Sequence, residues 1–169
     1  LLASSAASDV YKRQGENHSR VASVYNDIGE IYSVQGDDFK ALDYFKKSLK
    51  IVLSVYGENH SQVSSIYDHI GEIYFAQKDY SKALYYFEES LKIRLSLFGE
   101  NHPEVALSYY SIGSLYIIQG DKSKALNYYE KSLKIRLSVY GENHPLTKEI
   151  MDLINVANSK VLQSPETTK

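Results

Sequence analysis

Large apolar and aromatic side chains recur along the chain at the spacing of amphipathic helices. One set near the N-terminus lies at intervals of i, i+4, i+7 and i+11, and a second helical stripe follows Gly36. The first set is Val21, Tyr25, Ile28 and Tyr32, and the second is Ala41, Phe45, Leu49 and Val52. No strand pattern accompanies them. The spacing therefore predicts two helices joined by a short turn at Gly36.

This helix pair is one unit of a repeat. The tetrapeptide Gly-Glu-Asn-His occurs at intervals of 42 residues, starting at Gly15, Gly57, Gly99 and Gly141. A fixed period of this length indicates an array of supersecondary units. We therefore expect an array over residues 15–158, made of repeats 15–56, 57–98 and 99–140 and a capping helix over 141–158.

The two ends of the chain carry no such pattern. Residues 1–14, LLASSAASDVYKRQ, match nothing downstream, begin without methionine and contain no charged n-region. They resemble translated linker sequence, and we expect a non-native or disordered leader; a signal-peptide remnant ending at Ala6 and Ala7 is the alternative. Residues 159–169 include Pro165 and show no periodic apolar face, so we expect a disordered tail.

The composition narrows the class of protein. Of the 169 residues, 43% are hydrophobic and 24% are charged, which is typical of a globular protein and excludes disorder as the main state. A formal net charge of -2 leaves little attraction for nucleic acid. No apolar run approaches the ~18 residues of a membrane-spanning helix. The chain has no cysteine, which is compatible with a reducing compartment, and we expect a cytoplasmic protein.

The repeat carries a family resemblance. Its pattern Tyr25-x2-Ile28-Gly29-x2-Tyr32, followed by Ala41-x3-Phe45, resembles the tetratricopeptide repeat with Tyr in place of its Trp. The second unit has Tyr67, Ile70, Gly71, Tyr74, Ala83 and Phe87, and the third has Tyr109, Ile112, Gly113, Tyr116, Ala125 and Tyr129. The long period and the junction resemble the type found in kinesin light chains. The resemblance implies an all-α fold, a right-handed α-solenoid of tandem antiparallel helix pairs (a TPR superhelix).

The repeated glycines predict a close contact between helices. A glycine inside a helix costs about 1 kcal/mol relative to alanine, so Gly29, Gly71 and Gly113 make sense where two backbones approach closely. We expect Ala41, Ala83 and Ala125 to be their small partners. Three repeats and a further helix meet the usual minimum for a stable array.

The junction histidines suggest a metal site, but their spacing argues against it. Equivalent residues of stacked helix pairs lie at least ~8 Å apart, whereas zinc needs donor atoms ~2.0 Å from the ion. We therefore expect His18, His60, His102 and His144 to cap the helices that follow them. No nucleophile elbow, phosphate-binding loop or His-Glu-x-x-His motif occurs, so we expect a protein without catalytic activity, cofactor or metal.

The first helix of each unit has a second face that changes from repeat to repeat. The family resemblance implies that this face lines a concave peptide-binding groove. In the first two units it carries Asn26, Asp27, Glu30, Asp68, His69 and Glu72, and in the third Leu107, Tyr110, Ser114 and Ile118. The first set is acidic and the second is mostly apolar. The alternative is an ordinary solvated face that varies freely.

These features predict a non-enzymatic interaction module that binds a peptide or protein, as part of a larger adaptor or scaffold. The acidic and apolar halves of the face predict a ligand with basic residues at one end and large apolar residues at the other. The carboxylates have the wrong sign for the basic clamp by which other family members hold a C-terminal carboxylate. A structural spacer, or a repeat array that associates with itself end to end, is the alternative function.

Overall fold

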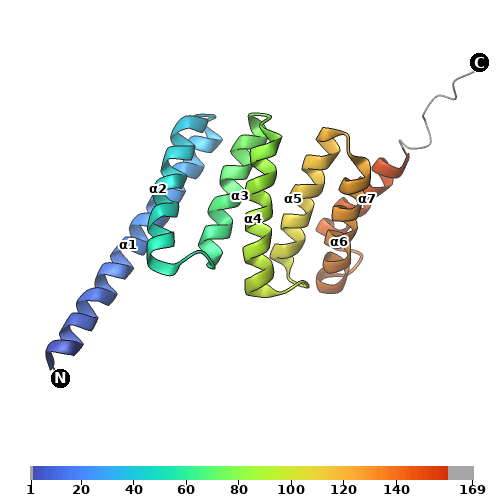
Figure 1. The fold of residues 1–169 in the computed structure, drawn as a ribbon. Coiled ribbons are helices and arrows are strands. Elements are labelled where there is room, and N and C mark those ends of the chain that lie inside the picture. The colour runs from blue at the N-terminus through green and yellow to red at the C-terminus, as the bar shows by residue number, and fades with distance from the viewer. Residues whose placement is uncertain (1, 160–169) are drawn as a thin grey trace, which may run out of the picture. The chain divides into compact units, whose positions relative to one another are not determined.

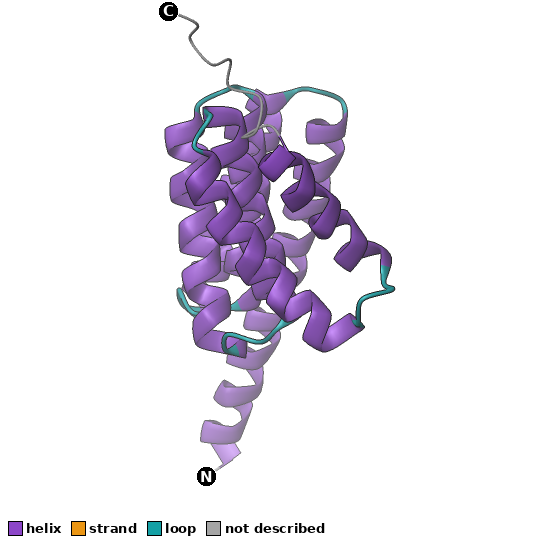
Figure 2. Ribbon diagram, turned by 90° about the vertical axis from the view of Figure 1, so that its right-hand side faces the viewer, coloured by secondary structure: helices purple, strands orange, loops and turns teal. Residues whose placement is uncertain are grey.

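The computed structural model describes residues 2–159, and describes side chains from residue 18 onward. Over these residues it contains seven helices and no strand (Figures 1 and 2). The helices are α1 (Leu2–Val34), α2 (Asp38–Tyr56), α3 (Ser61–Ala76), α4 (Tyr80–Phe98), α5 (Pro103–Gln119), α6 (Lys122–Tyr140) and α7 (Pro145–Ser159). The prediction of an all-α fold made of helix pairs is confirmed. No helix within 2–159 combines the length and the apolarity needed to cross a membrane.

The beginning of α1 differs from the expectation. Residues 2–14 are helical rather than disordered, and α1 continues through the first Gly-Glu-Asn-His motif without a break. Two features of the sequence explain this difference. The residues before Gly15 include good helix formers such as Ala, Leu, Lys and Arg, and the first motif does not follow a second helix of a repeat, as the three later motifs do. The expected tail falls, beyond Ser159, outside the described residues.

The chain divides into two compact units, with the boundary inside α4 between Ile93 and Arg94. In the first unit α1 and α2 lie side by side as an antiparallel pair, and α2 also contacts α3 (Figure 1). The core of this unit consists of Ala22, Ala41, Phe45, Val52, Val63, Ile66, Ile70, Ile73 and Ile93. In the second unit α5 pairs with α6, which also contacts α7. Of the predicted stripes of the first repeat, Ala41, Phe45 and Val52 belong to the core of the first unit, whereas Val21 is 42% exposed.

The repeated glycines do lie at close contacts, although the partner is not the one expected. A Cβ added to Gly29 would lie 2.7 Å from Cε1 of Phe45, and one added to Gly113 would lie 2.6 Å from Cδ1 of Tyr129. The nearest side chain is thus the aromatic ring of the second helix rather than the alanine of the motif. The backbone oxygen of Ala125 is a further neighbour of Gly113, at 3.3 Å. The absent side chain makes room for a ring that fills the space between the helices.

The junction histidines cap helices, as predicted, at three of the four junctions. Nδ1 of His60, His102 and His144 accepts a hydrogen bond from the backbone N–H two residues later, at 3.2–3.3 Å. Each imidazole also stacks on the aromatic ring four residues before it, with ring centroids 4.2–4.5 Å apart. The accepting Nδ1 carries no proton, so the neutral ring is protonated at Nε2. His18 lies inside α1 and has no such role.

Two buried arginines connect consecutive helices of the second unit. The side chain of Arg94, at the end of α4, is 4% exposed; it donates to Ser108 Oγ at 2.8 Å and pairs with Glu104 at 2.9 Å. Arg136, at the end of α6, donates to the carbonyl oxygen of Leu146 at 2.6 Å. Hydrogen bonds to charged groups contribute about 1.5–3 kcal/mol when buried. Both arginines therefore join the end of a second helix to the start of the helix that follows.

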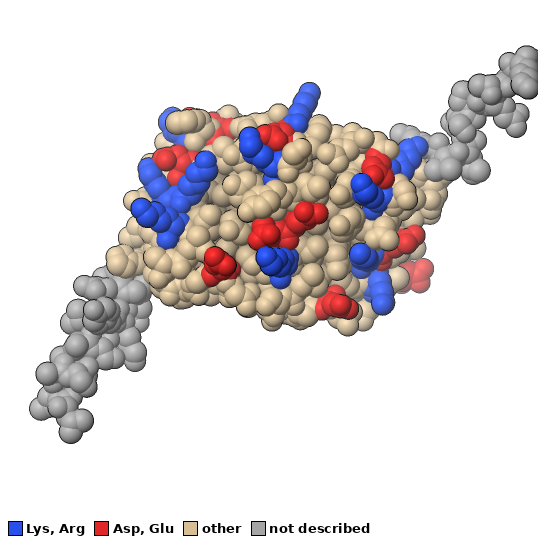
Figure 3. Space-filling model, viewed as in Figure 1, with Lys and Arg blue, Asp and Glu red and all other residues tan. Residues whose placement is uncertain are grey.

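The remaining charges are interspersed on the face drawn in Figure 3. Lysines near the start of the second helices pair with aspartates of the same helix or its cap, as in Lys40–Asp37 at 2.7 Å and Lys82–Asp79 at 2.6 Å. Hydrogen bonds from Lys40 lower the pKa of Asp37. Exposed pairs of this kind contribute little to stability, because solvent screens them. They balance charge locally at the start of these helices.

Candidate functional site

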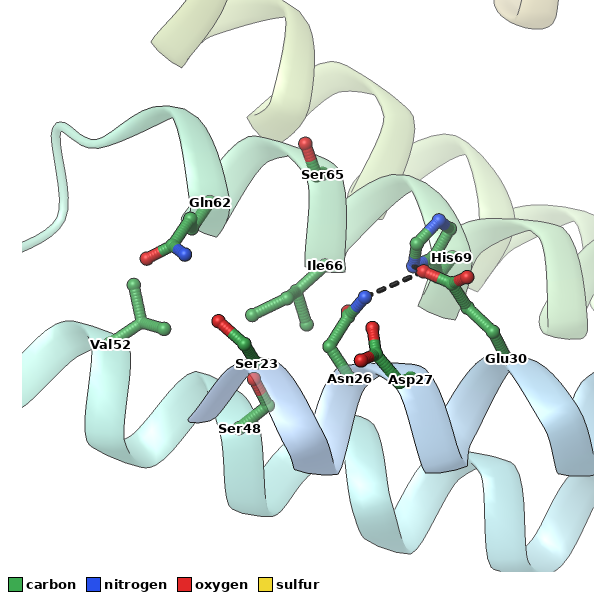
Figure 4. Close-up of a pocket in the computed structure, with 10 residues that line it drawn as sticks. All are labelled: Ser23, Asn26, Asp27, Glu30, Ser48, Val52, Gln62, Ser65, Ile66 and His69. Atoms are coloured by element: carbon green, nitrogen blue, oxygen red, sulfur yellow. Dashed lines mark hydrogen bonds and ion pairs between the residues drawn. The ribbon is translucent and has the colours of Figure 1, made fainter. Parts of the chain in front are cut away.

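A pocket of about 360 Å3 lies in the first unit, between α1 and α3 and above α2 (Figure 4). The residues that line it are Ser23, Asn26, Asp27 and Glu30 from α1, Ser48 and Val52 from α2, and Gln62, Ser65, Ile66 and His69 from α3. Four of the six residues predicted for the acidic half of the groove are among them. These four are Asn26, Asp27, Glu30 and His69.

The floor of the pocket is apolar and its walls are polar. Val52 is 1% exposed and Ile66 is 2% exposed, and both belong to the core of the first unit. Ser48, beside Val52, donates its hydroxyl to the carbonyl oxygen of Ala22 at 2.8 Å, which fixes α2 against α1. The residues that line the pocket come from α1, α2 and α3, and these three helices pack around the core of the first unit.

Two amide oxygens in the walls have no hydrogen-bond partner. Asn26 donates from Nδ2 to Oε1 of Glu30 at 2.6 Å, and its own Oδ1 is buried without a partner. Because a carboxylate only accepts, this hydrogen bond fixes the orientation of the amide. Oε1 of Gln62 is likewise buried and unpartnered. A buried acceptor without a donor is unfavourable by about 1–3 kcal/mol, so a ligand with N–H groups would satisfy both.

His69 forms the end of the pocket nearest Glu30. Its Nδ1 lies 3.8 Å from Oε1 of Glu30, and its ring centroid lies 5.0 Å from that of Phe45. The ring thus contacts the core on one side and a carboxylate on the other. Asn26, Glu30 and His69 form one connected group across α1 and α3, which Figure 4 shows by the dashed line to Glu30.

Asp68 and Glu72 lie on α3 near this group but do not line the pocket. Desolvation raises the pKa of Glu72, and the nearby carboxylates of Asp68 and Glu30 raise it further. The repulsion indicates that carboxylates of α1 and α3 crowd one another. A cation placed among them would relieve this repulsion.

The predicted residues of the second unit have a different character. Leu107 and Ile118 are 44% and 52% exposed and present apolar surface to solvent. Tyr110 is held by other residues: its hydroxyl donates to Glu149 at 3.0 Å, and the Arg136 guanidinium lies 5.0 Å from its ring centroid. Ser114 donates to the carbonyl oxygen of Tyr110 at 3.0 Å. Tyr110 and Ser114 are therefore committed to the fold, while Leu107 and Ile118 remain accessible.

A second, apolar pocket of about 190 Å3 lies in this unit, and the sequence pattern did not predict it. It is lined by Ile117, Lys122, Tyr129, Leu153, Val156 and Ala157. The positions equivalent to Ala157 in the preceding repeats are Leu115 and Ile73. A small residue where the other repeats have a large one is a signal for this pocket in the sequence. Four other residues of the first pocket were not predicted: Ser48 and Val52 lie on α2, a second helix of the repeat, and Gln62 and Ile66 lie on α3 outside the face that the repeat pattern selects.

Residues suited to a metal do not gather in the described part of the chain. Within 18–159, no group of three or more His, Asp and Glu residues is placed to hold an ion. The junction histidines His60, His102 and His144 use Nδ1 to cap a helix.

Comparisons with known proteins give a consistent result. A family model for the tetratricopeptide repeat matches residues 20–96 and 62–138. No curated protein matches the chain significantly by sequence.

Several solved structures have the same fold at low sequence identity. A putative kinesin light chain with nearly identical TPR-like repeats from Podosopora anserina has a TM-score of 0.72 at 17% identity, over 86% of this chain and 70% of that one. BtubC (BKLC) from P. vanneervenii has a TM-score of 0.69 at 20% identity, over 88% and 67%. The first TPR of Spaghetti (RPAP3), bound to an HSP90 peptide, has a TM-score of 0.61 at 16% identity, over 86% and 96%. With the family match across most of the array, these likenesses lead to one conclusion: the chain belongs to the tetratricopeptide repeat family.

Proposed function

We propose that the protein is a non-enzymatic interaction module that binds a peptide or protein segment along the variable faces of its first helices. The observation that carries this proposal is the pocket between α1 and α3, where the amide oxygens of Asn26 and Gln62 are buried without donors. Backbone N–H groups and basic side chains of a peptide supply such donors. The described chain uses the same scaffold in each repeat and varies the side chains of this face, as a ligand-reading surface would.

The ligand that we propose is basic where it meets α1 and α3, and apolar where it meets α5. Asp27 and Glu30 line the pocket, and no Lys or Arg does so. The TPR of Spaghetti (RPAP3), which has a similar fold, was solved with the HSP90 peptide SRMEEVD. Its consecutive glutamates would be repelled by the carboxylates of this pocket. On α5, Leu107 and Ile118 offer exposed apolar side chains to the rest of the ligand.

Panning a peptide library against the full chain tests the proposal. We expect enriched sequences with basic residues, whose association slows when Asp27 and Glu30 are replaced by Lys and becomes less sensitive to salt. The matched control replaces Asp43 by Lys in the same way. Asp43 is an exposed carboxylate of α2 that pairs with Lys47 at 2.7 Å and does not line the pocket. Enrichment of sequences that bind the charge-reversed chain equally well would contradict the proposed surface.

The second candidate is a structural spacer or self-associating array, which the exposed side of α1 favours. Val24, Ile31 and Val34 are 54%, 56% and 90% exposed. Sedimentation velocity over a range of concentrations separates the two functions. Assembly that grows with concentration, together with panning that returns nothing above background, would replace peptide binding by self-association. For either function we propose a cytoplasmic location and a role within a larger adaptor.

A further inference from the structure

The second helices of the three repeats differ at one position near their C-terminal ends. This position is Val52 in α2, Arg94 in α4 and Arg136 in α6, at intervals of 42 residues. All three side chains are buried, at 1%, 4% and 4% exposed. Two repeats thus insert a guanidinium where the first repeat inserts a short apolar side chain.

Both arginines contact the position 10 residues after them, at the start of the following first helix, and each has further contacts of its own. Arg94 contacts the residues 10 and 14 positions after it, Glu104 and Ser108. Arg136 contacts the carbonyl oxygen 10 positions after it, at Leu146, and the carboxylate 13 positions after it, at Glu149, 3.5 Å away. It also lies over the ring of Tyr110, 26 positions before it.

The same offsets counted from Val52 lead to residues of the pocket in the first unit. Positions 10, 13 and 14 after Val52 are Gln62, Ser65 and Ile66, and the position 26 before it is Asn26. All four line the pocket, with Val52 at its floor. The pocket therefore lies at the repeat positions that the arginine side chains contact in the other two repeats.

We propose that this pocket binds an arginine side chain of a protein partner, which occupies the place that Arg94 and Arg136 occupy in their own repeats. This inference rests on the proposed function and names the residue that the first unit reads. The partner thus supplies the guanidinium that the first repeat lacks, because this repeat has Val52 where the other two have arginine.

The chemistry of the walls suits arginine better than lysine. A guanidinium has five N–H donors in a planar fork, whereas an ammonium has three donors on one point charge. The acceptors available are the free amide oxygens of Asn26 and Gln62 and the carboxylates of Asp27 and Glu30. These acceptors stand on two helices, so a planar donor group can bond to both sides at once. The methylene groups of the ligand would lie against the apolar floor.

Three short labelled peptides test the assignment on the full chain. They share one uncharged sequence and carry Arg, Lys or citrulline at the centre, so that they differ only in charge and donor geometry. We expect the Arg peptide to bind about tenfold more tightly than the Lys peptide in fluorescence polarisation. Citrulline, which keeps the shape without the charge, should bind at least as weakly as Lys. The side-chain amide signals of Asn26 and Gln62 should shift with Arg in NMR spectra.

The most direct test is a variant in which a side chain of the protein itself fills the pocket. Val52→Arg restores the residue of the other repeats, and we expect it to abolish binding of the Arg peptide while circular dichroism stays helical. If that variant fails to fold, Glu30→Gln takes its place and should weaken the Arg peptide about tenfold. Asp43→Asn removes an equal charge from α2 outside the pocket and should leave binding unchanged.

Equal affinity for Arg and Lys, with equal losses in Glu30→Gln and Asp43→Asn, would overturn the assignment in favour of diffuse attraction. Binding of the Arg peptide that survives in a folded Val52→Arg chain would overturn it as well. The arginine pocket and the proposed function can fail separately. If panning yields peptides that bind the α1 and α3 faces without arginine, the interaction module is supported and only the arginine pocket is wrong.

Discussion

The ring of Phe87 occupies the space that a side chain on Gly71 would need. A Cβ added to Gly71 would lie 2.7 Å from Cε1 of that ring and 2.8 Å from Cδ1. Phe87 is 4% exposed and cannot swing into solvent without leaving the core. The contact joins α3 to α4, and the same relation recurs as Gly29 with Phe45.

Gly71→Leu should therefore destabilise the protein by about 1–3 kcal/mol, as overpacked cores do. Thermal unfolding followed by circular dichroism measures the change. In a Phe87→Ala background the same leucine should cost less, because the ring that it meets is gone. An unchanged melting temperature in the single variant would show that the close approach does not constrain position 71.

Ile73 and Ile31 occupy the same place in consecutive repeats but differ in burial. Ile73 is 2% exposed, whereas Ile31 is 56% exposed. We expect Ile73→Ala to destabilise the fold by about 2–5 kcal/mol, and Ile31→Ala to stay within about 1 kcal/mol of wild type. Urea unfolding of the two variants measures the change in the free energy of unfolding for the same substitution at a buried and at an exposed position. A similar loss for both would mean that a partner, such as a second copy, covers α1 in solution.

His102 caps α5 through Nδ1 and stacks on Phe98 with ring centroids 4.4 Å apart. Replacing it by alanine removes both contacts, and the loss of a cap typically costs about 1 kcal/mol. His102→Asn should recover most of that stability, because asparagine is a strong capping residue. His18→Ala is the matched control within α1 and should have little effect in urea titrations. Equal losses for His18 and His102 would remove the capping explanation.

Glu72 should make stability depend on pH. Burial and the charges of Asp68 and Glu30 raise its pKa above the ordinary value of 4.5. The folded state then binds more protons than the unfolded state, so this carboxyl lowers stability as the pH rises from about 4.5 through its folded pKa.

Glu72→Gln keeps the neutral form at every pH. Its melting temperature should exceed that of wild type at pH 7, and the gap should shrink toward pH 4. With Asp68→Asn in both proteins, the gap at pH 7 should be smaller, because one source of repulsion is gone. A gap that does not change with pH would assign the effect of the substitution to something other than ionisation.

Local pattern was sufficient for most of the fold. The spacing of Tyr25, Ile28 and Tyr32 predicts a helix because i, i+3, i+4 and i+7 neighbours share one face whatever surrounds them. The 42-residue period and the recurring Gly-Glu-Asn-His motif predict the helix pairs and three of the four junctions. The acidic character of Asp27 and Glu30 could likewise be read from the chain alone, since formal charge does not depend on folding.

What only the tertiary structure decided involves contacts between residues far apart in sequence. The reach of a side chain depends on which groups oppose it, so the sequence pattern did not reveal that Arg136 and Glu149 hold Tyr110, or that Phe87 rather than Ala83 meets Gly71. The pocket itself arises because Val52 is short where Gln62 and Asn26 converge from two other helices. A void of this kind is a property of three packed elements together, and no periodicity within one of them encodes it.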